Sequence, residues 1–248
     1  MSNAMDQERE WAIWALEQWS TFPVNRDPRP LVLVGPRIRT DQGFSSATAK
    51  IAFLTGAIDG DASVPPAVLE LLRATDWSGT MSLEPARPVV RNARLSEAEF
   101  MTDRGRQMLP AWRLESDGVI GSIWVLDPES VRTEWRLPEP PLRPAPFPGI
   151  PHRAQAASID PDDRHLDFRF VGRPENLADY RSAEVIESPT AVVVLPTMMY
   201  REPFGPHSIV SPVGRTRSVS VELGAPLGAR VLVDLDARPV VVSRADGD

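Results

Sequence analysis

The stretch Ser218-Val219-Ser220-Val221-Glu222-Leu223 alternates polar and apolar residues, as a strand with one buried face does. Working outward from it, other short apolar or alternating segments recur, separated by Gly and Pro. They lie at residues 168–171, 191–195, 231–233 and 240–242. Short strands at spacings of about 8–12 residues with Gly/Pro turns are typical of a sandwich. We therefore predict an antiparallel β-sandwich over residues 152–248.

Helical and strand patterns are mixed in the N-terminal half. Residues 6–19 contain no Gly or Pro, and Trp11, Trp14 and Trp19 contribute to a broad apolar face, which predicts a helix. Its polar face is acidic, whereas membrane-surface helices favour Lys and Arg, so we expect this helix to pack on the protein itself. Further helices are predicted at 47–57 and 66–75, and strands at 31–34, 88–95, 110–115 and 119–126. Asp117-Gly118 predicts a two-residue hairpin loop between the last two strands.

A proline-rich segment separates the two halves. Seven prolines fall within residues 138–151. Such a composition favours extended polyproline II and acts as a semi-rigid spacer. Pro141-Leu142-Arg143-Pro144 also has the spacing of a Pro-rich ligand motif, but a linker is the favoured interpretation. The predicted fold class is thus α+β, with an α+β region at residues 5–136, a linker at 137–151 and the sandwich at 152–248.

Composition excludes several classes of function. The 248 residues include 27 Lys+Arg and 34 Asp+Glu, which gives a formal net charge of −7. Nucleic-acid binders usually carry a basic footprint because phosphate neutralisation dominates their affinity, so we predict no nucleic-acid partner. Cysteine is absent, which excludes disulfides, thiolate nucleophiles and zinc sites that need sulfur. Lys50 is the only lysine, and no Gly-rich phosphate loop precedes it.

The hydropathy of the sequence and the charge near its start indicate where the protein is located. The sequence contains no apolar run near the ~18–20 residues that a membrane-spanning helix needs. Met5-Asp6-Gln7-Glu8 is acidic, unlike the basic start of a signal peptide. We therefore predict no membrane span and a cytoplasmic location. The alternative is that the chain is the extracytoplasmic part of a longer protein with an upstream anchor.

Two strings in the sequence carry a resemblance to other proteins. The first is Thr102-Asp103-Arg104-Gly105 followed by Leu109-Pro110-Ala111-Trp112, and the second is Ala225-Pro226-Leu227-Gly228-Ala229-Arg230 followed by Asp234. In these strings the chain resembles a group of uncharacterised proteins from GC-rich bacteria. Members of that group often carry a membrane or lipid anchor and a cysteine in the region of Ala183. The resemblance implies no known activity, and an envelope-associated structural protein is the hypothesis that it adds.

Each string also has a purely structural interpretation. The first is a turn that enters the strand carrying Trp112. In the second, Pro226-Leu227-Gly228 is a turn in which Gly228 is free to take a positive φ. Arg230 and Asp234 are expected to pair across a loop.

The three histidines offer the main route to an enzyme. They are His152, His165 and His207. Imidazole and carboxylate ligands suffice for zinc or iron, and His165 lies within an acidic run at residues 160–167. That run lacks the Gly and the distal Glu of a calcium loop, so the favoured interpretation is a hairpin turn between Ile159 and Leu166. We predict no metal site and no cofactor.

Templates for nucleophilic catalysis also fail. Gly-x-Ser-x-Gly is absent, and the neighbours His207 and Ser208 would face opposite ways on a strand. The alternative function that stays open is a hydrolase, with or without a metal, that uses histidine and carboxylate side chains.

A segment interrupted by Pro and Gly is the best candidate for recognition. Residues 200–207 carry two aromatic residues, an arginine and a histidine, and binding loops on rigid β scaffolds often have this composition. We predict a binding surface formed by Tyr200, Arg201, Phe204 and His207. The leading prediction is a non-enzymatic soluble binding or interaction protein whose partner is a protein or a small molecule.

Overall fold

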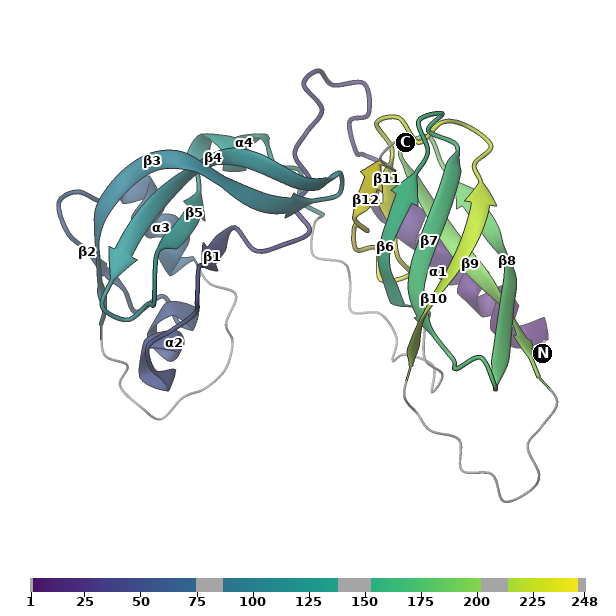
Figure 1. Cartoon of the computed structure of the whole chain (residues 1–248). Helices are drawn as coiled ribbons and strands as arrows, with labels where there is room; N and C mark the ends of the chain where they lie inside the picture. The colour runs from purple at the N-terminus through teal and green to yellow at the C-terminus, as the bar shows by residue number, and fades with distance from the viewer. Residues whose placement is uncertain (1, 75–86, 138–152, 202–213, 245–248) are drawn as a thin grey trace. The chain divides into compact units, whose positions relative to one another are not determined.

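The computed structural model of the chain describes residues 2–74, 87–137, 153–201 and 214–244. It has helices and many strands in mixed sheets, so the fold class is α+β (Figure 1). The chain divides into two units, each with its own core. Unit 1 contains Met1–Val34, Thr102–Gly105 and Trp135–Asp248, and unit 2 contains Gly35–Met101 and Arg106–Glu134.

Two sheets make up most of unit 1. One has the order β10-β7-β6-β12 and the other the order β11-β9-β8. The first is formed by β6 (Arg153–Ile159), β7 (His165–Gly172), β10 (Arg215–Glu222) and β12 (Val242–Arg244). The second is formed by β8 (Ala178–Glu187), β9 (Ala191–Tyr200) and β11 (Val231–Val233). The predicted strands at 168–171, 191–195 and 231–233 therefore lie inside β7, β9 and β11.

The sheets of unit 1 are not purely antiparallel, and that part of the prediction is wrong. β11 pairs parallel with β9, and β12 pairs parallel with β6. Parallel neighbours need a crossover between them. Strand β10 provides part of that crossover for β11, because it follows β9 in the chain but belongs to the other sheet.

Alternation along the strands gives unit 1 its principal core. In β7, Leu166, Phe168 and Phe170 are buried while the residues between them are exposed. These three side chains pack with Val192 and Val194 of β9, so both sheets contribute to one cluster. Burial of such side chains contributes roughly 1.5–3 kcal/mol each, so this cluster is a major source of stability in unit 1.

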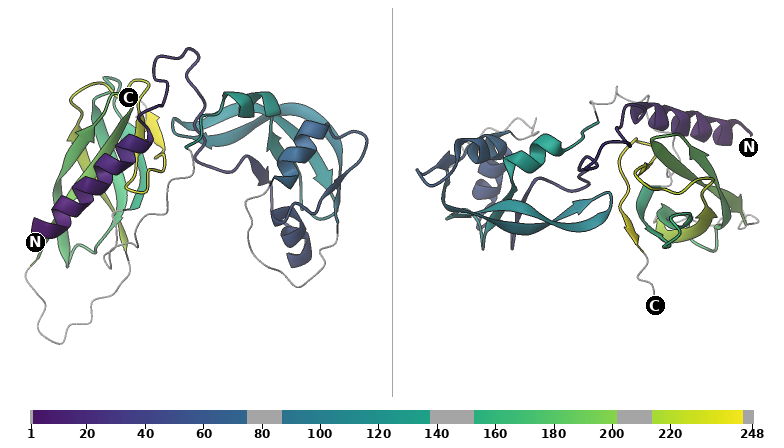
Figure 2. Two further views of the ribbon diagram at one scale, coloured as in Figure 1. Left: turned by 180° about the vertical axis from the view of Figure 1, so that it is seen from behind. Right: turned by 90° about the horizontal axis from the view of Figure 1, so that it is seen from above.

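The N-terminal helix α1 (Ser2–Gln18) belongs to unit 1 and not to the N-terminal region with which it was expected to fold. Figure 2 shows the helix lying along the strands of this unit. Its buried face packs on the side of β9 and β11 that faces away from the first core. The second core includes Ala12, Ala15, Leu16, Trp19, Ala191, Val193, Val231 and Val233. Strand β9 is thus covered on both faces, which is why residues 191–196 are all buried and do not alternate.

Unit 2 contains a five-stranded sheet with the order β1-β5-β4-β3-β2. Its strands are β1 (Ile38–Thr40), β2 (Asp59–Gly60), β3 (Val89–Thr102), β4 (Gly105–Ser116) and β5 (Ile123–Leu126). Its helices are α2 (Ala47–Leu54), α3 (Pro66–Arg73) and α4 (Pro128–Thr133). The core joins Val68 and Leu72 of α3 to Leu114 and Ile123 of the sheet.

The connection between β4 and β5 is longer than predicted. Asp117 and Gly118 do occupy a turn, closed by the bond from the Val119 N–H to the Ser116 carbonyl (3.1 Å). The strands, however, pair only as far as Leu114 and Ile123. After the turn the chain leaves the hairpin. Val119 forms a β-bridge with Phe44, and its side chain lies in the core of unit 2.

For the other predicted elements of the N-terminal half, the positions agree with the structure better than the lengths do. The helices at 47–57 and 66–75 are confirmed as α2 and α3, which end a few residues earlier. The strand predicted at 31–34 is wrong, because Leu33 makes only an isolated bridge to Thr102. The predicted linker at 137–151 lies outside the described residues, except for Leu137.

Candidate functional site

Two of the four predicted binding residues can be placed. Tyr200 ends strand β9, and Arg201 follows it directly. Both are exposed, Tyr200 to 56% of its full area. Phe204 and His207 lie outside the described residues. The site is therefore built from the strand ends around Tyr200.

The ends of four strands meet at this place. Arg215, the first residue of β10, pairs with Gly172 at the end of β7, and Ala178 at the start of β8 pairs with Tyr200. Figure 1 shows these strand ends at the same end of unit 1. We call this place the arginine end. It comprises Arg173, Glu175, Asp179, Tyr180, Arg181, Tyr200, Arg201, Arg215 and Arg217.

A buried layer supports the arginine end. The Arg217 guanidinium lies over the Tyr180 ring, 5.6 Å from its centroid, and is paired with Glu175 at 2.7 Å. Tyr180 packs edge-on against Phe170 at 5.0 Å. Gly172 makes this packing possible, since a Cβ there would lie 2.8 Å from Cγ of Arg217 and 3.0 Å from ring carbons of Phe170 and Tyr180. The side chain of Arg217 is only 13% exposed, so it acts as a support rather than as a contact surface.

An outer layer of arginines covers this support. The Arg173 guanidinium lies over the ring of Tyr200, 5.3 Å from its centroid, and such cation–π contacts hold a tyrosine in one orientation. The backbone N–H of Arg173 donates to the hydroxyl of Tyr180 (2.9 Å), which ties the outer layer to the inner one. The side chain of Arg181 is 74% exposed and that of Arg201 55% exposed.

One carboxylate is shared by two of the exposed arginines. Oδ2 of Asp179 accepts a hydrogen bond from Nε of Arg181 (2.7 Å) and lies 3.8 Å from Nη2 of Arg201. The hydrogen bond from Arg181 is the main cause that lowers the pKa of Asp179 below its ordinary value, and the charge of Arg201 adds to it. The arginine end thus stabilises a carboxylate in its ionised form.

Positive charge is in excess at the arginine end. It carries five arginines and two carboxylates, whereas the whole chain has a net charge of −7. Arg173 and Arg215 have no carboxylate partner among the described residues. An excess of guanidinium groups with exposed aromatic surface is a composition that favours anionic partners.

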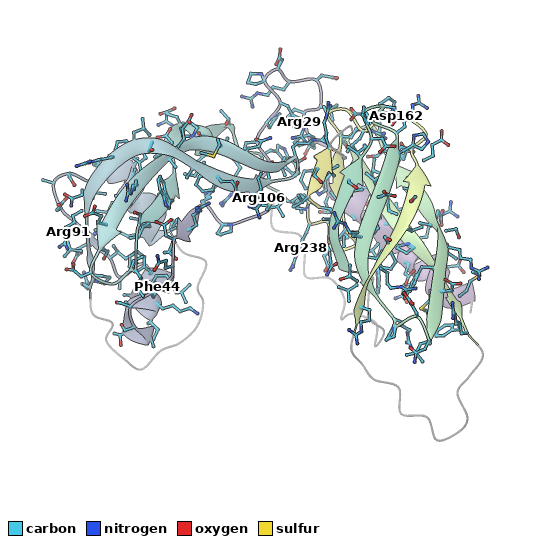
Figure 3. All side chains as sticks on the ribbon, viewed as in Figure 1. Arg29, Phe44, Arg91, Arg106, Asp162 and Arg238 are labelled. Atoms are coloured by element: carbon cyan, nitrogen blue, oxygen red, sulfur yellow. The ribbon has the colours of Figure 1, made fainter. Side chains whose placement is uncertain are left out.

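The acidic turn at residues 160–165 forms a hairpin, as predicted between Ile159 and Leu166. Oδ1 of Asp162 accepts the backbone N–H groups of Arg164 (2.9 Å) and His165 (3.2 Å), and Oδ2 contacts Nδ1 of His165 at 2.5 Å. Figure 3 shows the Asp162 side chain on this turn. These bonds, with the Arg164 N–H first, lower the pKa of Asp162 to about 2, and Asp162 in turn raises the pKa of His165.

A hollow of about 340 Å³ lies beside this turn and is lined by His165, Asp167, Ser220 and Glu222, among others. Its geometry does not assemble a nucleophile with a base, because the Ser220 hydroxyl donates to Asp167 and His165 is bound to Asp162. Within residues 2–74, 87–137, 153–201 and 214–244, no group of three His, Asp or Glu side chains is arranged to hold a metal ion. His152 and His207 lie outside these ranges.

The first of the two strings, at Thr102-Asp103-Arg104-Gly105, forms the turn between β3 and β4, as predicted. Asp103 at this turn is 2% exposed and receives both Nη1 (3.1 Å) and Nη2 (2.5 Å) of Arg29. Its backbone N–H donates to the Val32 carbonyl (3.0 Å), and its own carbonyl accepts the Val242 N–H (2.9 Å). Figure 3 labels Arg29, which lies in the loop that follows α1.

The second string lies against the first. Nη2 of Arg104 donates to the carbonyls of Gly228 (2.6 Å) and Arg230 (2.5 Å), and Nε of Arg29 donates to that of Ala229 (2.9 Å). Gly228 has the predicted positive φ, at 50°. Sequence reasoning placed the two strings in different halves and missed their contact, which only the folded chain reveals.

The predicted pairing of Arg230 with Asp234 is wrong. Arg230 pairs with Glu187 through Nη1 at 2.5 Å, and its other nitrogen donates to the carbonyls of Ala225 and Pro226. Asp234 instead accepts the backbone N–H groups of Asp236 (2.9 Å) and Arg238 (2.8 Å) and so closes its own turn. Burial raises the pKa of Asp234 above its ordinary value.

Sequence reasoning also missed most of the arginine end. Arg173 directly follows β7, Arg181 lies in β8, and β10 contains both Arg215 and Arg217, so these four arginines have no common motif. One feature of the sequence could have indicated this cluster. Arginines recur near the boundaries of the predicted strands, both before and after residues 200–207.

Comparisons with known proteins add no relative. A scan against protein-family models, a search of curated proteins and a search of solved structures each found no match to this chain. Among the described residues, none of the helices is both long enough and apolar enough to cross a membrane.

Proposed function

We propose that the chain is a non-enzymatic binding protein and that the arginine end of unit 1 is its recognition surface. The observation that carries this proposal is the layered arrangement there, in which exposed arginines and Tyr200 lie on a buried support of Arg217 and Tyr180. Binding surfaces in which arginine and tyrosine are held rigidly lose little conformational entropy when a partner docks. The partner is a protein or a small molecule, and not a nucleic acid.

The proposal includes a finer architecture and a location. Residues 152–248 form a β-sandwich that carries the recognition surface, and residues 137–151 are a linker. The shared core of Phe168, Phe170, Val192 and Val194, contributed by two sheets, supports the sandwich. We further propose a cytoplasmic location and kinship with the bacterial group that shares the two strings. The contacts of Arg29 and Arg104 with residues 228–230 give a physical reason for the two strings to occur together.

Site-specific photo-crosslinking tests the proposal. A photoreactive phenylalanine analogue replaces Tyr200 in the full chain, and a control chain carries it at Leu95, which is equally exposed at 59% but lies in unit 2. Irradiation in a lysate of a GC-rich bacterium is expected to give a defined adduct from position 200 and none from position 95. Arg201→Glu is expected to reduce the adduct, because it reverses one charge beside Tyr200. Equal labelling at both positions, or no adduct, contradicts the proposal.

A further inference from the structure

We infer that the partner recognised by the arginine end is an acidic peptide segment of another protein. This inference rests on the proposed function and names the chemistry of the partner. It is carried by charge, by geometry and by a carboxylate that already occupies part of the surface.

The excess of positive charge at the arginine end indicates that the partner is negatively charged. Five arginines face two carboxylates at the arginine end, on a chain whose net charge is −7. Arg173 and Arg215 have no carboxylate partner among the described residues, so two guanidinium groups are available for anions. A local patch opposite in sign to the rest of the surface orients a charged partner and speeds its encounter.

Asp179 shows how the surface receives a carboxylate. Its Oδ2 lies 2.7 Å from Nε of Arg181 and 3.8 Å from Nη2 of Arg201. The planar fork of an arginine fits a carboxylate with two parallel hydrogen bonds. Arg181 and Arg201 each have further N–H groups exposed to solvent, so a second carboxylate from a partner can join the same arrangement.

Geometry favours a peptide over a single small anion. The available arginines come from separate strand ends, and neighbouring strands in a sheet lie about 4.8 Å apart. Arg173 and Arg215 lie in or next to strands of one sheet, and Arg181 and Arg201 lie in or next to strands of the other. An extended peptide carries side chains on one face at intervals of about 6.6–6.8 Å, so its acidic residues can reach more than one of these arginines at once. Tyr200, held under Arg173, offers exposed apolar area between these charges.

The overall charge of the chain disfavours a nucleic acid. Polyanions gain their affinity from many phosphate contacts along a basic track. The arginine end is a short patch of five arginines and not a long basic track, and the turn at the β6–β7 hairpin of the same unit carries Asp160, Asp162 and Asp163. A short acidic peptide can use the patch without meeting that turn.

Fluorescence anisotropy with a labelled oligoglutamate peptide tests the inference on the full chain. Oligolysine of the same length and oligothymidylate are the comparison probes. At about 0.01 M ionic strength, oligoglutamate is expected to bind, and its affinity is expected to fall at about 0.15 M because exposed charges are screened. Oligolysine is attracted by the net charge of −7 elsewhere on the chain, so its binding is expected not to weaken when Arg173 and Arg215 are replaced by Gln. No binding of oligoglutamate at the lower ionic strength, or tighter binding of oligothymidylate, overturns the inference.

Matched variants locate the binding. Arg173→Gln combined with Arg215→Gln is expected to weaken oligoglutamate binding about tenfold, given the usual contribution of exposed ion pairs. The control combines Arg26→Gln with Arg94→Gln, two exposed arginines that lie elsewhere and make the same change in net charge. It is expected to change the affinity by less than about twofold. Arg215→Gln alone serves if the double variant folds poorly, because Arg215 is exposed and makes no side-chain hydrogen bond or ion pair with the described residues. An equal loss in the control overturns the inference.

The two proposals fail in different ways. A defined crosslink at position 200 to a partner without an acidic segment removes the inference and leaves the proposed function standing. Absence of any crosslink at that position removes the proposed function itself.

Discussion

At the scale of single residues, the carboxylate of Asp103 is the most deeply buried among the described residues. It is buried, and it faces the guanidinium groups of Arg29 and Arg104. Burial is also the main cause that lowers the pKa of Arg104 below its ordinary value. A buried carboxylate with two arginines is stabilising only while all partners are present, because each group has given up water.

Asp103→Asn is therefore expected to lower the free energy of unfolding of unit 1 by about 3 kcal/mol. The variant keeps the shape of the side chain but removes the negative charge that Arg29 and Arg104 share. Urea unfolding followed by circular dichroism measures the change. Glu129→Gln is the control, since its pair with Arg132 is exposed on both sides and should contribute less than about 1 kcal/mol. Similar losses in the two variants would contradict this account.

The pair of Asp162 and His165 predicts a dependence on pH. The pKa of Asp162 is lowered from 3.8 to about 2, so its contribution to stability is present above pH 3.8 and is lost as the pH falls towards 2. The pKa of His165 is raised above 6.5, so its contribution is present below pH 6.5 and is lost as the pH rises through the raised value. The turn is most stable between these limits.

An NMR titration of the imidazole protons checks this prediction. The signal that disappears in His165→Gln is expected to titrate above 6.5 in the unaltered chain. Asp162→Asn is expected to return that pKa towards its ordinary value, because the amide carries no charge. The amide oxygen can still accept the backbone N–H groups of Arg164 and His165, so the turn itself is kept. An unchanged titration in Asp162→Asn would rule out this pairing.

At the scale of elements, the sequence predicted strands and helices whose pattern is local. Leu166, Phe168 and Phe170 alternate with exposed residues, and the strand that contains them was found correctly. Helix α1 was found from its tryptophans, but an apolar face does not say what covers it. Its partners in β9 and β11 follow it by more than 170 residues, and no local rule connects them.

Elements that break a local rule were placed less well. Strand β4 contains Pro110, and β9 contains Pro196, although proline removes a hydrogen bond from a ladder. Pro110 lies just before the residues that pair with β5, and Pro196 lies beyond the residues that pair with β11. Each proline thus lies outside the ladder on one side of its strand, and only the pairing of distant strands shows that.

The candidate site was predicted in part for the same reason. Tyr200 and Arg201 are adjacent in sequence and were identified together. The arginines that surround them reach the same place through the register of β7 with β10 and of β8 with β9. The sequence shows which side chains lie at the end of each strand. Which strand ends lie next to one another is decided by the pairing of the strands in the sheet.

At the scale of the whole molecule, unit 1 is assembled from distant parts of the chain. Met1–Val34 supplies α1, and Trp135–Asp248 supplies both sheets. Trp19 connects them, with its ring 4.4 Å from that of Trp135 and its indole N–H bonded to the Ala237 carbonyl (2.9 Å). Met1–Val34 therefore supplies much of the cover on the outer side of β9 and β11.

A fragment of Trp135–Asp248 alone is expected to bind the dye ANS strongly and to unfold without a sharp transition, because Val193, Val231 and Val233 lose their cover. A fusion of Met1–Val34 to Trp135–Asp248 through a flexible linker is the matched control. It restores the helix and is expected to bind much less dye and to unfold more cooperatively. Equal dye binding by fragment and fusion would show that α1 is not needed for this core.

The bond between Trp19 and Ala237 spans 218 positions in the sequence and has a consequence during synthesis. The ribosome makes α1 first, yet the strand and turn on which α1 rests are made almost last. At elongation rates of about 5–20 residues per second, roughly 10–45 s pass between the synthesis of Trp19 and that of Ala237. During that interval a nascent chain exposes three tryptophans to the cell, so early capture by a holding chaperone would protect it.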